Sequence, residues 1–172
     1  MKTTNFQKIV DAAYDIHLKT SSFVAKLIGP MVFDFGSKDK NWNLTTADLL
    51  RYSEGSLGKA MGRFLQENKV EPLANAEYHD VHHVLFDYSI TFKDEVALQF
   101  FLRGNGKRSL ASLGTSIGAW ILLPTQWDYL RKAYKRGQNC VDISQLNLKE
   151  LLNEDLQKIK SSLYKNQTYE NK

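Results

Sequence analysis

Apolar residues recur at three- and four-residue steps along most of this chain, and this spacing constrains the fold more than any other feature. Leu57, Ala60, Met61 and Phe64 follow it within residues 56–68. Such spacing places apolar residues on one face of an α helix, whereas a half-buried strand alternates strictly. No convincing strand pattern occurs, so the sequence predicts an all-α fold.

Periodicity and the placement of glycine and proline together predict a bundle of about seven helices. Ser56 is the expected start of one helix, Thr91 begins another with Asp94 in a variant capping box, and Gly137 is an expected helix end. The expected helices, with the short one at 46–52 counted separately, cover residues 6–18, 46–52, 56–68, 75–88, 91 onward, 108–123, 125–137 and 148–164.

Length and composition predict one globular domain over residues 1–172. With 42% hydrophobic and 24% charged residues, the chain resembles a folded protein long enough to enclose a core. Residues 166–172 are expected to fray. The single cysteine, Cys140, excludes an intrachain disulfide and fits a reducing compartment. The N-terminal residues match neither a secretory signal nor a transit peptide, so a cytosolic location is expected.

The formal net charge is +4, and basic residues crowd the second half of the chain. This clustering is compatible with solvated helix ends, with an anionic lipid surface or with an acidic ligand group. No nucleic-acid-binding motif accompanies it, so nucleic acid is not an expected partner. The basic residues concerned are Arg103, Lys107, Arg108, Arg131, Lys132, Lys135 and Arg136.

An apolar segment, SLASLGTSIGAWILL, occupies residues 109–123. It is too short to cross a bilayer, which requires about 20 apolar residues. A buried core helix, the wall of an apolar cavity and a membrane-dipping element all remain open. Gly114 and Gly118 would let another helix approach this segment closely.

Three of the four histidines lie in the run HDVHH, residues 79–83. On a helix that turns about 100° per residue, His79, His83 and Asp80 share one face. Val81 and Leu85 belong to the opposite, apolar face, which would pack against the protein. The helix therefore has a packed side and a side that carries ligand-type residues.

Glu95 lies in the first turn of the following helix, which is apolar nearly all round. A carboxylate beside such a surface requires a partner. Ser89 marks the expected turn, with His83 six residues before it and Glu95 six residues after it. In an antiparallel helical hairpin these two positions face each other. A metal ion held by the hairpin would supply the missing positive charge.

Two imidazoles with one or two carboxylates suit zinc best, although iron or manganese would accept the same ligands. Asp80 would then be either the fourth ligand or the adjacent base. Two other interpretations stay open. In the first, HDVHH is an ordinary polar helix face, and Glu95 pairs with Lys or Arg. In the second, HDVHH is a variant of the metalloprotease motif H-E-x-x-H in which aspartate replaces glutamate.

The pattern H-D-x-x-H, eleven residues, then glutamate spans residues 79–95 and resembles the metal signature of the coenzyme Q (ubiquinone) biosynthesis protein four family. EGSLGKAMGRFL, at residues 54–65, resembles that family's G-[ST]-[LV]-G segment and the helix after it. The resemblance covers residues 53–163. Asp87 and Asp94 depart from it, because each stands where the family usually has glycine.

The resemblance implies a helical protein that binds membranes peripherally, on their inner, cytoplasmic face, and shelters a polyprenylated quinone precursor beside its metal. His79, His83 and Glu95 would be ligands, and Asp80 a ligand or proton-transfer group. The implied reaction is an oxidative decarboxylation that replaces a ring carboxyl group with hydroxyl. Leu110, Ile117, Trp120 and Ile121 are candidate walls for the lipid tail.

The resemblance favours an enzyme but does not by itself imply catalysis, since the family was long regarded as a scaffold for other quinone-biosynthesis proteins. The alternatives are therefore a noncatalytic lipid-binding scaffold of a biosynthetic complex and an unrelated metallohydrolase. A homodimer is compatible with the sequence.

Overall fold

In this computed structural model, the residues described are 42–72, 77–108, 123 and 125–164. They form six α helices and two short 3-10 helices, with isolated β-bridges in place of strands. The predicted all-α fold is confirmed for this part of the chain. The contacts divide the chain into two compact units. We name them the α4 unit (described residues 42–72, 77–87 and 138–164) and the α6 unit (described residues 88–108, 123 and 125–137).

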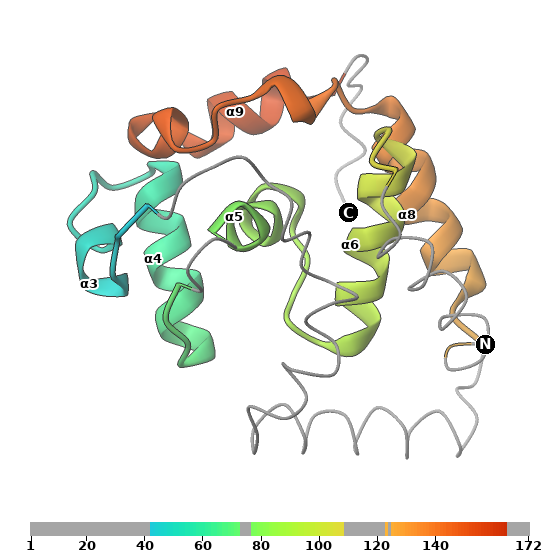
Figure 1. Cartoon of the computed structure of the whole chain (residues 1–172), viewed down its shortest axis with the longest axis horizontal. Coiled ribbons are helices and arrows are strands. Elements are labelled where there is room, and N and C mark those ends of the chain that lie inside the picture. The colour runs from blue at the N-terminus through green and yellow to red at the C-terminus, as the bar shows by residue number, and fades with distance from the viewer. Residues whose placement is uncertain (1–41, 73–76, 109–122, 124, 165–172) are drawn as a thin grey trace. The chain divides into compact units, whose positions relative to one another are not determined.

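The α4 unit is built around α4, which contacts α3, α5 and η2. Figure 1 shows α3 beside α4. Of the apolar stripe predicted for α4, Leu57 and Met61 are buried, and Ala60 and Phe64 are half-buried. Leu65, which the prediction did not include, is buried as well. The elements of this unit are α3 (Thr46–Leu49), α4 (Leu57–Asn68), α5 (Glu77–Phe86), η1 (Ile143–Gln145), η2 (Glu150–Asn153) and α9 (Leu156–Ser162).

The start of α4 was predicted correctly. Ser56 is its N-cap, and its side chain accepts a hydrogen bond from the backbone N–H of Lys59. Gly55 precedes it with φ +81°, a left-handed conformation that glycine adopts without steric cost. The GSLG segment thus combines a tight turn, a helix cap and the buried residue Leu57.

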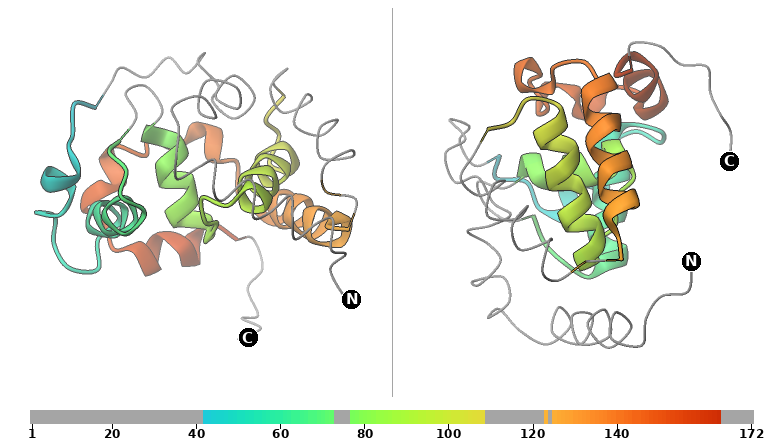
Figure 2. Two further views of the ribbon diagram at one scale, coloured as in Figure 1. Left: turned by 90° about the horizontal axis from the view of Figure 1, so that it is seen from below. Right: turned by 90° about the vertical axis from the view of Figure 1, so that its right-hand side faces the viewer.

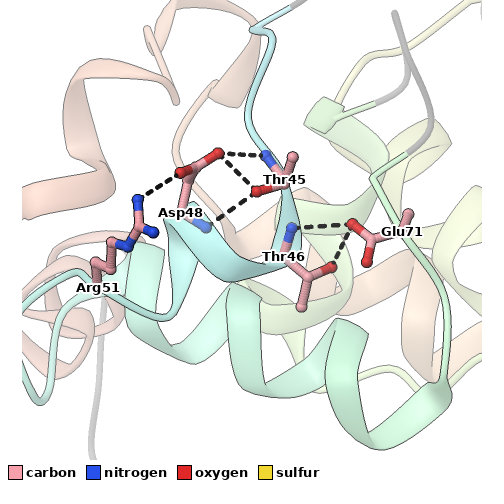
Figure 3. Close-up of polar contacts among 5 residues, drawn as sticks. All are labelled: Thr45, Thr46, Asp48, Arg51 and Glu71. Atoms are coloured by element: carbon pink, nitrogen blue, oxygen red, sulfur yellow. Dashed lines mark hydrogen bonds and ion pairs between the residues drawn. The ribbon is translucent and has the colours of Figure 1, made fainter.

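α3 is shorter than the helix expected over residues 46–52. Thr45 and Asp48 form a capping box at its start, in which the Thr45 side chain accepts from the Asp48 N–H and Asp48 accepts from the Thr45 N–H at 3.0 Å (Figure 3). Beyond Leu49 the chain tightens into three-residue steps, since the N–H of Arg51 bonds to the carbonyl of Asp48. These tighter bonds end the α helix.

The single helix predicted over residues 148–164 is wrong, because the chain forms η2 and then α9. Asp155 starts α9 by accepting a hydrogen bond from the Lys158 N–H. The backbone at this break pairs instead with the turn before α4: Leu57 donates to the carbonyl of Glu154, and Leu156 donates to that of Gly55. These long-range hydrogen bonds replace the intrahelical ones.

The α6 unit contains α6 (Phe92–Gly104) and α8 (Trp127–Asn139), which lie side by side in Figure 2. Gly137 was predicted as a helix end, but α8 continues through it. A Cβ atom on Gly137 would lie 2.0 Å from the carbonyl oxygen of Phe101, and one on Gly104 would lie 2.1 Å from that of Tyr134. Both glycines therefore serve close backbone packing of α6 against α8.

α5 ends at Phe86, and Asp87 follows with φ +57°. Asp87 thus adopts the left-handed conformation in which glycine is most common, and its carboxylate lies 2.5 Å from the Lys160 ammonium.

Three of the sequence predictions lie outside the described residues: the helix over residues 6–18, most of the helix over 108–123, and the frayed tail at 166–172. In the described part, no helix combines the length and apolarity needed to cross a membrane.

Candidate metal centre

His79 and His83 face each other one turn apart on α5. Their Nε2 atoms are 3.0 Å apart, and their rings meet edge to face with centroids 4.6 Å apart. His83 is 2% exposed, whereas His79 is half-buried. The predicted ligand-bearing face of this helix is therefore present, with both Nε2 atoms directed at a common point.

Neighbouring side chains of the α4 unit hold this face in place. The ring of Phe64, on α4, stacks on that of His83 with centroids 5.4 Å apart. At the first residue of α5, buried Glu77 accepts a hydrogen bond of 3.0 Å from the backbone N–H of Trp42. His82 turns elsewhere and stacks on Phe86. Sequence periodicity indicated Phe64 as a core residue, but nothing in it signalled the stacking on His83.

Glu95 follows in the first turn of α6 and is half-buried. Among the described residues, His79, His83 and Glu95 each offer one ligand atom to a group whose atoms all lie within 4.8 Å of one another. Asp80 lies outside this group, although its Oδ2 atom is shielded from solvent. The role of Asp80 as ligand or base stays a prediction.

The capping box predicted at Thr91 and Asp94 is wrong. Thr91 is the N-cap of α6, but its side chain makes no capping hydrogen bond. Asp94 instead accepts from the Ser89 N–H at 3.0 Å and from the Ser89 hydroxyl at 2.5 Å. Its other oxygen accepts from the Tyr129 hydroxyl at 2.7 Å. Sequence reasoning missed this network because Tyr129 is 35 residues away in the chain.

Burial raises the pKa of Tyr129 above its ordinary value, and the hydrogen bond to Asp94 raises it further. Tyr129 therefore stays a neutral hydrogen-bond donor to the carboxylate. The ammonium of Lys93 lies over its ring, 4.8 Å from the centroid. The charge of Asp94 is thus satisfied by groups of the α6 unit.

Fold and donor set define a class: an all-helical protein in which two imidazoles and a carboxylate form a candidate ligand set for a divalent cation. The sequence profile of the family described as coenzyme Q (ubiquinone) biosynthesis protein Coq4 matches residues 38–167. The chain belongs to this family. This confirms the resemblance found in the sequence and assigns the chain to quinone biosynthesis.

A crystal structure from Nostoc punctiforme, of a protein assigned provisionally to ubiquinone biosynthesis, has a similar fold. Its TM-score is 0.55 at 20% sequence identity, and the match covers 95% of this chain and 83% of that one. At this identity the likeness shows the fold alone. No curated protein matches the sequence significantly.

Proposed function

We propose that this chain is a metal-dependent enzyme of quinone biosynthesis, in which His79, His83 and Glu95 bind one divalent cation, zinc in the first instance. The proposed substrate is a polyprenylated hydroxybenzoate whose ring carboxyl group is replaced by hydroxyl. The observation that carries the proposal is the pair of Nε2 atoms facing each other at 3.0 Å, joined by an oxygen of Glu95 in one group.

The donor set fits such a cation. Ligand nitrogens at about 2.0–2.1 Å from a tetrahedral zinc are separated by about 3.3 Å, and the two Nε2 atoms, 3.0 Å apart, are close to that spacing. Two imidazole lone pairs that face each other repel unless a proton or a cation lies between them. Iron and manganese accept the same ligands. Zinc is proposed first because imidazole and carboxylate are common zinc ligands in proteins.

When bound, the cation would supply Lewis acidity that polarises a carboxylate or phenolate oxygen of the aromatic head. Asp80, next to His79 on α5, is proposed as a further ligand or as the group that holds the proton to be transferred. Phe64 fixes the ring plane of buried His83 by stacking. A fixed ring keeps its nitrogen aimed at one point, which reduces the cost of binding.

In the proposed reaction the bond from the ring to the carboxyl carbon breaks and carbon dioxide leaves. A new bond joins the ring carbon to a hydroxyl oxygen supplied by water. The exchange removes two electrons from the substrate, and dioxygen accepts them with two protons to give hydrogen peroxide. Dioxygen is thus the oxidant that the proposal requires.

A polyprenyl tail requires an apolar environment, and the apolar segment 109–123, of which only Leu123 is among the described residues, is proposed to line it. We place the protein at the cytoplasmic face of a membrane, near other quinone-biosynthesis proteins. The support is an exposed basic face on α8, which would attract anionic lipid headgroups. We name it the α8 basic face; it consists of Arg131, Lys132, Lys135 and Arg136.

The decisive experiment measures metal content and turnover in the same preparations. Zinc-loaded protein is incubated in air with a prenylated hydroxybenzoate in micelles, and mass spectrometry follows the exchange of carboxyl for hydroxyl. We expect turnover and about one zinc ion per chain in the parent. His83→Ala and Glu95→Ala should lose both, whereas Asp80→Asn should lose turnover.

His82→Ala is the matched control, because it removes an imidazole from the same helix that stacks on Phe86 instead of facing His79. It should keep its zinc. A parent that binds zinc and lipid but turns over no substrate would contradict the enzyme proposal and favour the scaffold. Hydrolysis of soluble peptides or phosphoesters without any lipid would favour a metallohydrolase.

A further inference from the structure

The carboxylate of Asp94 ties two segments of the α6 unit to the start of α6. Its Oδ2 accepts two hydrogen bonds from Ser89, in the turn before the helix. Its Oδ1 accepts one from Tyr129, on α8. Both oxygens are therefore engaged, and each engages a different segment.

Aromatic contacts support the same junction. The Lys93 ammonium, one residue before Asp94, lies over the ring of Tyr129. Further along α6, Phe100 meets Trp127 edge to face, with centroids 6.1 Å apart. The first turn of α6 is thus held to the first turn of α8 by a hydrogen bond and a cation–π contact, and the third turn of α6 adds an aromatic contact with Trp127.

Glu95 is the next residue after Asp94, and its N–H donates to the carbonyl of Thr91 at 2.8 Å. Any shift of this first turn would move the Glu95 carboxylate with it. A free carboxylate at position 94 would also compete for a cation, because it is adjacent in sequence to Glu95. Three hydrogen bonds hold Asp94 away from that role.

We propose that Asp94, Ser89 and Tyr129, which we name the Asp94 clamp, position Glu95 for metal binding. The inference rests on the proposed function, since it assigns these residues to the same candidate metal centre. Asp94 is a positioning residue, not a ligand. The Asp94 carboxylate thus holds the helix that carries the acidic ligand.

The expected size of the effect follows from ligand placement. Productive sites hold their ligands to within about 0.5 Å, and loss of a supporting contact typically weakens metal binding about 10- to 100-fold. Removing one member of the clamp should therefore weaken zinc binding without removing a ligand. Loss of His83 or Glu95, in contrast, should remove binding altogether.

The test uses the full chain with Asp94→Ala and the milder Tyr129→Phe, which deletes only the hydroxyl that donates to Asp94. Zinc affinity is measured by competition with a chromophoric chelator, and the visible spectrum of the cobalt-loaded protein reports the ligand geometry. Both variants should bind zinc at least about tenfold more weakly than the parent, with an altered cobalt spectrum. The double variant should lose less zinc-binding free energy than the sum of the two single losses, because both substitutions remove the same hydrogen bond between Tyr129 and Asp94.

Tyr134→Phe is the matched control, since it removes a phenolic hydroxyl from the same helix away from Asp94. It should retain the parent's zinc affinity and cobalt spectrum. Parent-like affinity and spectrum in folded Tyr129→Phe would overturn the clamp while leaving the proposed metal centre standing. A parent that binds no zinc at all would overturn both proposals together.

Discussion

Single residues decide how closely α6 and α8 approach in the α6 unit. Gly137 and Gly104 each face a backbone carbonyl of the other helix at a distance that no Cβ could occupy. In an exposed helix, replacing glycine by alanine stabilises by about 1 kcal/mol. At these two positions the clash is with backbone atoms, which cannot turn aside, so steric repulsion should outweigh helix propensity.

We therefore expect Gly137→Ala to lower the free energy of unfolding by about 2 kcal/mol. For a chain of this length, that corresponds to a melting temperature lower by roughly 4–8 °C, which calorimetry would detect. Gln138→Ala, at the exposed neighbouring position, is the control and should change little. A rise in the melting temperature of Gly137→Ala would contradict the close contact with Phe101.

Among the helices, two identical spacings have different outcomes. Threonine followed three residues later by aspartate occurs at Thr45 and at Thr91, but a capping box forms only at the first of these. Asp48 is half-buried, and within the described part of the chain its carboxylate accepts from Thr45 and from the Arg51 guanidinium. Asp94 has Ser89 and Tyr129 within reach, and they engage its carboxylate instead. A local signal thus predicts a cap only where no tertiary donor competes.

The capping box of α3 predicts a pH dependence. Hydrogen bonds from Thr45 lower the pKa of Asp48 below its ordinary value, with the Arg51 charge adding to them. Because the pKa is lower in the folded state, the stabilisation by Asp48 is present above the unfolded-state pKa of about 4 and is lost as the pH falls through the folded-state pKa.

Asp48→Ala should therefore unfold at lower urea concentration than the parent at neutral pH, and the difference should vanish in acid, below the folded-state pKa of Asp48. Urea titrations at the two pH values measure this. Asp128→Ala controls for loss of a charge, since its exposed carboxylate lies 4.0 Å from Arg131 and takes part in no capping box that the structure describes. If Asp48→Ala destabilised the protein equally in acid and at neutral pH, the stabilisation by the capping box would not depend on the charge of Asp48.

For the molecule as a whole, the net charge of +4 matters less than where it lies. The α8 basic face carries four cations at exposed positions, with Asp128 as the acidic residue on the same side of the helix. Such a surface attracts anionic headgroups by about 1 kcal/mol per basic residue. The membrane binding proposed above would therefore use this face of the α6 unit.

Reversing two of these charges, Lys132→Glu with Lys135→Glu, should weaken binding to vesicles rich in phosphatidylglycerol by more than about tenfold. Cosedimentation at low and high salt measures it, and the parent's binding should fall as salt screens the attraction. The matched control reverses two exposed lysines of the α4 unit, Lys149→Glu with Lys158→Glu. An equal loss of vesicle binding in both double variants would show that binding depends on the net charge of the protein and not on the α8 basic face.

Much of the α4 unit and two of the three residues of the candidate centre could be predicted from the chain's local pattern. The stripe on α4, its Ser56 cap and the shared face of His79 and His83 all depend on helical spacing over a few residues. Helix geometry is the same wherever a helix forms, which is why such features are visible without a fold.

Contacts between distant segments settled the rest. The break before α9 follows from hydrogen bonds between Glu154 and Leu57, the role of Gly137 from its contact with α6, and the partner of Asp94 from the position of Tyr129. Local propensities differ by less than about 1 kcal/mol per residue. A backbone clash or an ion-assisted hydrogen bond costs or contributes more than that, so the packed neighbour prevails over the local preference.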